Sequence, residues 1–167
     1  LRSHVRRAGA GPCMAFARIG FLSASVRRSL SENIMSRAAA RESLFKLVYE
    51  YAVRGERDDF TLSLLSNGMS EDDSAYLVSS YDGVLAHKDE IMNVIAAHSR
   101  DFALDRIYKV DLAILAVAVY EILYRDDIPY SVSANEATEL AGKYSTDKSY
   151  SFVNGLLASV IKEKKNG

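Results

Sequence analysis

The chain has 167 residues and a mass of 18.5 kDa, about the size of one ordinary domain. Hydrophobic residues make up 49% of it, which allows a sizeable core and excludes wholesale disorder. The formal net charge of −1 argues against a protein that coats nucleic acid through bulk charge. The longest uncharged run of the expected fold, residues 112–120, is too short to span a bilayer, so we expect a soluble protein without a membrane segment.

Charge is divided unevenly along the chain. Residues 1–34 carry six arginines and one acid, a sum of +5, whereas residues 35–167 carry 15 basic and 21 acidic residues, a sum of −6. The first stretch is rich in Gly, Ala and Ser and has no sustained amphipathic period. We therefore expect a basic extension of low order over 1–34 and a helical domain over 35–167. Three interpretations of the extension stay open: a misplaced start upstream of Met35, a targeting peptide, or a basic arm that touches RNA.

Four helices are predicted before residue 100. Residues 36–54 carry an apolar stripe at steps of three and four, and Gly55 ends that helix. A short helix follows from about Asp58 to residue 67. Ser70 caps the next one, whose first turn is acidic and which extends to residue 85. Another helix is expected from residue 87 or 88 to 98.

Three more helices are predicted after residue 100. Residues 105–124 form the most apolar stretch, which indicates a central helix buried on most sides. Pro129 marks a break, and Ser133 with Glu136 forms a capping box that begins a helix to residue 144. The last helix begins at Asp147 or Ser149, and Gly155 within it suggests close packing. No hairpin pattern is present, so the predicted class is all-α.

Enzyme motifs are missing from the sequence. It contains no phosphate-binding loop, dinucleotide-binding turn or nucleophile elbow, and adjacent acids such as Asp58 and Asp59 do not face one another on a helix. The only cysteine excludes an intrachain disulfide, and the three histidines lack metal-ligand spacing. We expect a protein that is not an enzyme and that has no cofactor and no metal.

Two small basic clusters lie at helix starts. Arg37 and Arg41 are four residues apart at the start of the first helix, where cations oppose the helix dipole. Lys143, Tyr144 and Lys148 gather at the junction of the last two helices. Positive charge next to aromatic rings suits single-stranded nucleic acid, although clusters this small are explained more simply by solvated surface residues at Arg37 and Arg41 and by a core position for Phe152.

From Met35 to about Ile161 the chain resembles the NusB family of transcription antitermination factors. The order and spacing of several motifs carry this resemblance. They are Ala40-Arg41-Glu42 with Leu47-Val48-Tyr49, Asp111-Leu-Ala-Ile-Leu with Ala118-Val119-Tyr120-Glu121, Ile128-Pro129-Tyr130, Asn135-Glu136-Ala137, Asp147-Lys148-Ser149-Tyr150 and Phe152-Val153-Asn154-Gly155-Leu156-Leu157.

The resemblance implies a fold, a function and partners. The fold is two small helical bundles packed together, with about seven helices. The function is binding of single-stranded boxA RNA in ribosomal RNA leaders, together with the ribosomal protein NusE, to promote antitermination by RNA polymerase in the cytoplasm. The implied RNA-binding residues are Arg37, Arg41, Lys148, Ser149 and Phe152. The implied partner-binding residues are Tyr49 and Asp111, while Asn135, Glu136 and Gly155 are structural.

The chain also departs from the family pattern. Alanines stand between Arg37 and Arg41, and Ala116, Gly142 and Ser151 stand where the family often has a basic residue. Fewer phosphate contacts predict a weaker RNA affinity for the chain alone. Two alternatives stay open: a helical protein-interaction module with reduced RNA binding, and a stand-alone RNA-binding domain related to that of ribosomal RNA cytosine methyltransferases. Monomer and homodimer are equally compatible with the sequence.

Overall fold

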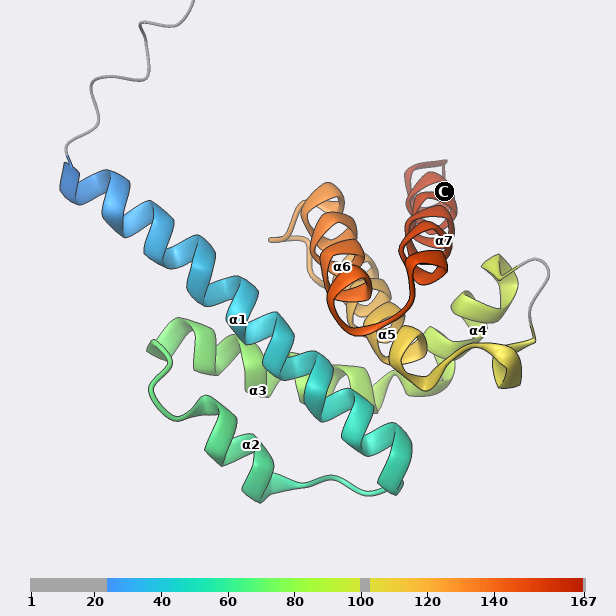
Figure 1. The fold of residues 1–167 in the computed structure, drawn as a ribbon, viewed down its shortest axis with the longest axis horizontal. Helices are drawn as coiled ribbons and strands as arrows, with labels where there is room; N and C mark the ends of the chain where they lie inside the picture. The colour runs from blue at the N-terminus through green and yellow to red at the C-terminus, as the bar shows by residue number, and fades with distance from the viewer. Residues whose placement is uncertain (1–23, 100–102, 167) are drawn as a thin grey trace, which may run out of the picture. The chain divides into compact units, whose positions relative to one another are not determined.

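A computed structural model describes residues 24–99 and 103–166 of the chain, with side chains from Arg37 onward. These residues form seven α-helices and one short 3-10 helix, and no strand occurs among them (Figure 1). The elements in chain order are α1 (Ala24–Arg54), α2 (Asp59–Ser66), α3 (Glu71–Ala86), α4 (Lys88–His98), η1 (Leu104–Arg106), α5 (Lys109–Tyr124), α6 (Tyr130–Tyr144) and α7 (Asp147–Asn166). The all-α prediction is confirmed, and none of the described helices is long and apolar enough to cross a membrane.

Helix α5 is the centre of the core, as its composition predicts. Eleven of its sixteen residues are buried, and the helix contacts α3, α4, α6 and α7. It passes so close to α3 that a Cβ atom at Gly83 would overlap the ring of Tyr120. Helices α6 and α7 pack on α5 and on each other, while α2 packs on α3 (Figure 1).

Local signals in the sequence fix several helix ends. Gly55 has a φ of +79°, the left-handed conformation that ends α1. The Asp58 carboxylate accepts hydrogen bonds from the backbone N–H groups of Phe60 and Thr61 at the start of α2. Ser70 Oγ accepts from the N–H of Asp73 and caps α3. The predicted C-terminal end of α1 and the predicted starts of α2 and α3 are confirmed.

Four local predictions are wrong. Helix α1 begins at Ala24 rather than at residue 36, because no glycine or proline interrupts residues 24–54. Helix α5 begins at Lys109, after a 3-10 turn that includes Asp105. Helix α6 begins directly after Pro129, so Ser133 lies inside it and does not cap it. Gly155 is exposed, with nothing within 4 Å of a Cβ built there, so close packing does not explain it.

The chain divides into two units, 1–33 and 34–167, and the domain boundary that the sequence predicts between residues 34 and 35 stays a prediction. Residues 1–23 lie outside the described part of the chain, so the three interpretations of the basic extension stay predictions. The second unit contains every residue that the sequence predicts to bind RNA or a partner.

Candidate RNA and protein-partner interface

Arg37 and Arg41 lie around one buried tyrosine, Tyr76 of α3. The guanidinium of Arg37 is 4.5 Å from the ring centroid and pairs with Asp73 at 3.1 Å, and its side chain is 32% exposed. The guanidinium of Arg41 is 5.8 Å from the same ring, but its side chain is only 6% exposed. The two arginines therefore share a neighbour, yet only Arg37 has substantial access to solvent.

Arg41 is part of a buried polar network centred on Glu121 of α5. Arg41 Nε donates to Glu121 Oε1 at 2.9 Å, Tyr76 Oη donates to the same oxygen, and Ser133 Oγ donates to Glu121 Oε2 at 2.6 Å. The Glu121 side chain is 1% exposed, so this network joins α1, α3, α5 and α6 away from water. Burial and the Glu121 carboxylate both raise the pKa of Tyr76, which keeps its hydroxyl protonated as a donor.

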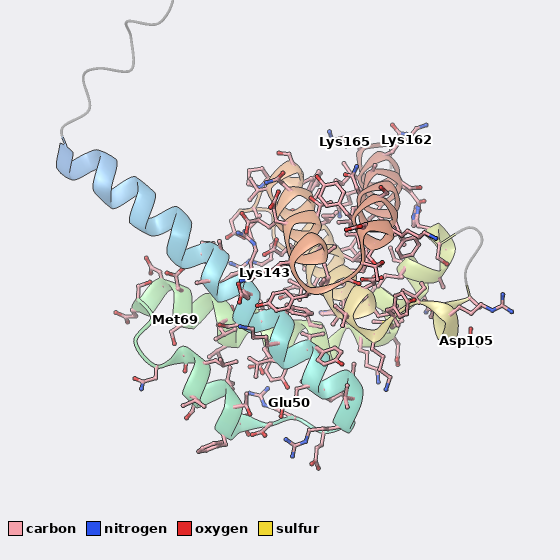
Figure 2. The ribbon with its side chains drawn as sticks, viewed as in Figure 1. Glu50, Met69, Asp105, Lys143, Lys162 and Lys165 are labelled. Carbon is pink, nitrogen blue, oxygen red and sulfur yellow. The ribbon has the colours of Figure 1, made fainter. Side chains whose placement is uncertain are left out.

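A second ion-pair cluster joins α1 to α6 at the surface. The Glu42 carboxylate accepts from Lys46 Nζ at 2.8 Å, from Lys143 Nζ at 2.7 Å and from Tyr144 Oη. These three donors lower the pKa of Glu42 to about 2. Both ammonium groups also lie over the Tyr144 ring, at 5.8 Å for Lys46 and 5.1 Å for Lys143. Figure 2 shows Lys143 at this approach of α6 to α1.

The remaining predicted RNA-binding residues line one cavity together with the predicted partner residue Asp111. The cavity has a volume of about 750 Å³ and lies between the start of α5 and the start of α7. Its lining residues are Arg106, Ile107, Tyr108, Asp111, Thr146, Asp147, Lys148, Ser149 and Phe152. Lys148 is exposed, whereas Asp111 and Ser149 are each 3% exposed and joined by a hydrogen bond of 2.7 Å.

Tyr49, the other predicted partner residue, lies on α1 next to the surface cluster. Its side chain is 36% exposed, and its ring is 6.3 Å from that of Phe45, which in turn is 5.1 Å from that of Tyr144. Three aromatic rings therefore extend from Tyr49 to the C-terminal end of α6. Tyr144 is three residues before Asp147, the first residue of α7 and part of the cavity wall.

Several residues of these sites were not predicted from the sequence. Glu121 and Tyr76 hold Arg41, and Arg106 and Tyr108 line the cavity. One signal was available for Arg41: it precedes Leu44 and Val48 by three and seven residues, which places it on the apolar stripe of α1. A charged residue inside the very apolar α5 signals a buried ion-pair partner. The turn that contains Arg106 had no such signal.

Ala116, which stands where the family often has an arginine, is 1% exposed inside α5. It lines a small apolar cavity of about 250 Å³ between α1, α3, α4 and α5. The expectation that this alanine removes a phosphate contact stays a prediction. Among residues 37–99 and 103–166, no group of three or more His, Cys, Asp or Glu residues could hold a metal ion.

Solved structures with this fold include NusB proteins. The chain matches a structure of T. maritima NusB with a TM-score of 0.69 and 27% identity, over 78% of this chain and 97% of that one. It also matches a crystal structure of the antitermination factors NusB and NusE in complex with dsRNA, with a TM-score of 0.70 and 25% identity, over 77% of this chain and 98% of that one.

Sequence comparisons give the same family. The chain is 42% identical over 134 residues to the transcription antitermination protein NusB of Finegoldia magna, covering 79% of this chain and 98% of that protein. It is 41% identical over 132 residues to the protein of the same name from Acetivibrio thermocellus, covering 78% of this chain and 91% of that protein. The NusB family profile matches residues 38–162. The chain therefore belongs to the NusB family of transcription antitermination proteins.

Proposed function

We propose that the chain binds boxA RNA of ribosomal RNA leader transcripts together with NusE, and so promotes antitermination by RNA polymerase in the cytoplasm. It acts by binding and not by catalysis. The observation that carries this proposal is the match to NusB bound to NusE and dsRNA, which covers 98% of that NusB chain. The family profile covers residues 38–162, which include Arg41 and the start of α7 with Lys148.

The surface between α6 and α7 suits the RNA best. Lys148 is exposed and has no ion-pair partner among the described residues, and Tyr150 and Tyr144 nearby are 45% and 36% exposed. Single-stranded RNA needs cations for its phosphates and ring faces for its unstacked bases, and this surface offers both. Arg37 adds a second, partly exposed cation on α1.

Arg41 contributes to binding through the fold rather than through a phosphate. Its guanidinium is buried and its Nε is already bonded to Glu121. An RNA phosphate would have to break a buried ion pair to reach it, and this would leave the Glu121 carboxylate without its cation. We therefore infer that the ion pair between Arg41 and Glu121 holds α1 against α5. It thereby positions Arg37, four residues earlier on α1, to contact the RNA.

The test is a titration of fluorescently labelled boxA RNA with the full chain, followed by anisotropy, with and without purified NusE and over a series of salt concentrations. We expect tighter binding to boxA than to a scrambled RNA of equal length, a further gain with NusE, and an affinity that falls as salt rises. Equal affinity for both RNAs in the presence of NusE would contradict the proposal and favour a protein-interaction module, the alternative that the burial of Arg41 supports.

A further inference from the structure

The small cavity of about 250 Å³ between α1, α3, α4 and α5 has a floor of hydrocarbon side chains. The floor residues, each at most 5% exposed, are Val48, Val84, Ile91, Ala113 and Ala116. The half-buried wall residues are Tyr51, Leu85, Met92 and Leu112. No side chain of the floor can donate or accept a hydrogen bond, so a polar group that entered to this depth would lose its hydrogen bonds to water without replacement. The floor therefore favours an apolar occupant.

The size of the cavity limits that occupant to a single ring or a short branched chain. A hydrocarbon cavity of about 150 Å³ holds one benzene molecule. The volume of about 250 Å³ therefore accommodates one ring with a short alkyl linker. A nucleobase is excluded by chemistry, because its ring nitrogens and exocyclic groups would be buried without partners. This cavity is therefore unsuited to the bases of an RNA.

Two lysines lie at the mouth of the cavity. Lys88 is the first residue of α4 and Lys109 is the first residue of α5. Lining residues follow each lysine by three and four positions, which places both lysines on the helix faces that line the cavity. Lys88 Nζ lies 5.4 Å from the ring centroid of Tyr51, and Lys109 Nζ donates to the carbonyl oxygen of Ala52 at 3.4 Å. Because Tyr51 and Ala52 are consecutive lining residues of α1, both ammonium groups are near the same part of the rim.

The charges around this mouth favour an anion. Both lysines are exposed, and neither forms an ion pair with a described residue. The first-turn acids of α4, Asp89 and Glu90, do not line the cavity, and Glu50 and Glu56 of the neighbouring segment pair with Arg54. A cation at the first position of a helix also opposes the helix dipole, so helix preference does not explain either lysine. An anionic group at the rim would be attracted by two ammonium groups next to an apolar cavity.

We propose that this cavity is a binding site for a small amphipathic carboxylate. Its ring or short branched chain enters the cavity, and its carboxylate stays at the mouth beside Lys88 and Lys109. Ala116 determines the size of the ligand, because any larger side chain at this position would occupy the same space. The site needs neither RNA nor a protein partner, so the inference does not depend on the proposed function.

The experiment follows the methyl groups of the cavity floor by NMR in the full chain, with isotope-labelled valine and isoleucine methyl groups. The probe is phenylpropionate, and phenylpropanol is its neutral analogue. We expect the methyl signals of Val48, Val84 and Ile91 to shift in the ring current of the probe, with a dissociation constant on the order of 1 mM. The alcohol should bind about three- to fivefold more weakly. Unshifted floor signals at about ten times that concentration, or equal affinity for both probes, would overturn the inference.

Variants separate the lysines from the cavity itself. Lys88→Met keeps the length of the side chain and should weaken phenylpropionate binding about threefold while leaving phenylpropanol binding unchanged. Lys162→Met is the matched control, because α7 contributes no residue to this cavity, and it should leave both affinities unchanged (Figure 2). Equal effects of these two variants on phenylpropionate binding would reduce the attraction to bulk charge and overturn the site.

Filling the cavity is the third test. Ala116→Leu should abolish the floor shifts with both probes, because its side chain takes the place of the ring. Thermal melting shows whether this variant folds. A folded Ala116→Leu variant that binds both probes as the wild type does overturns the inference. If overpacking prevents folding, Lys88→Met and Lys162→Met, both at exposed positions, decide the question.

Discussion

Two neighbouring residues of α1 differ in burial, and this difference distinguishes an ion pair that stabilises the fold from one at the binding surface. Arg41 and Glu42 are adjacent in sequence, and both form ion pairs with other helices. The Arg41 side chain is 6% exposed and faces Glu121 of the central helix, whereas the Glu42 side chain is 25% exposed and faces Lys143 of α6. Successive residues of a helix point in different directions, so the first pair lies in the core and the second at the surface.

The loss of one ion-pair partner therefore has different consequences in the core and at the surface. A buried ion pair that loses one partner leaves an uncompensated charge in a medium that solvates it poorly. A surface ion pair is solvated and screened, so its ammonium groups can exchange the carboxylate for another anion at little cost. We infer that the Arg41–Glu121 pair holds the fold together, while the cations near the α6–α7 junction are available to RNA.

Removing Arg41 is expected to cause the largest change in stability. Arg41→Ala should lower the free energy of unfolding by about 3–5 kcal/mol, because Glu121 stays buried without its cation. Urea denaturation followed by circular dichroism measures this change. Lys46→Ala is the control: its side chain is 45% exposed and that of its partner Glu42 is 25% exposed, so it should lower the free energy of unfolding by about 1 kcal/mol or less.

A double variant tests whether the charge itself is the cause. Arg41→Met with Glu121→Gln removes both charges and keeps an acceptor for Tyr76 and Ser133, so it should recover most of the stability that Arg41→Ala loses. If Arg41→Ala unfolded like the wild type but bound boxA RNA more weakly, Arg41 would be a phosphate ligand and the comparison would fail.

Removing Lys148 should have the opposite profile. Lys148→Ala should weaken boxA binding by about fivefold and reduce the slope of log affinity against log salt by about 0.7, as expected for one phosphate contact on a single strand. Its stability should not change, because the side chain is exposed and forms no ion pair among the described residues. Lys165→Ala, at the opposite end of α7, is the control and should leave the salt slope unchanged (Figure 2). An equal effect of both variants would indicate bulk charge instead of a site.

The helices and the core were predictable because they depend on local pattern. The apolar periods of 44–51 and 112–122 are long and regular, and caps such as Ser70 act within three residues. The wrong boundary at Ser133 has a tertiary cause. Its hydroxyl, which a capping box would bond to its own helix, bonds instead to Glu121, and Pro129 already begins the helix.

The candidate site was predictable only in part. The sequence and the family resemblance selected Asp111, Ser149, Lys148 and Phe152, and the structure brings all four to one cavity. The hydrogen bond between Asp111 and Ser149 joins residues 38 positions apart, and no periodic pattern specifies such a contact. Arg41 was selected for its charge, but its burial depends on Glu121, 80 residues away.

The smallest expected change in stability is at Glu42 in the surface cluster. There, unlike at Arg41 in the core, the loss of the ion pair should lower stability and raise RNA affinity. The folded pKa of Glu42, about 2, lies below its ordinary value of 4.5, so its ion pairs stabilise the fold above pH 4.5 and cease to do so as the pH falls through 2. Glu42→Gln should therefore lower the free energy of unfolding at pH 7 by about 0.5–1 kcal/mol, with the difference from wild type shrinking between pH 4.5 and pH 2.

The same variant should strengthen RNA binding. Without the Glu42 carboxylate, Lys46 and Lys143 keep their positions near the Tyr144 ring but lose their competing anion, so boxA affinity should rise about two- to fivefold at low salt and return to the wild-type value at high salt. Urea titrations between pH 2 and pH 7 and RNA anisotropy at two salt concentrations measure both effects. A parallel loss of stability and RNA affinity would show that this cluster, like Arg41, acts through the fold.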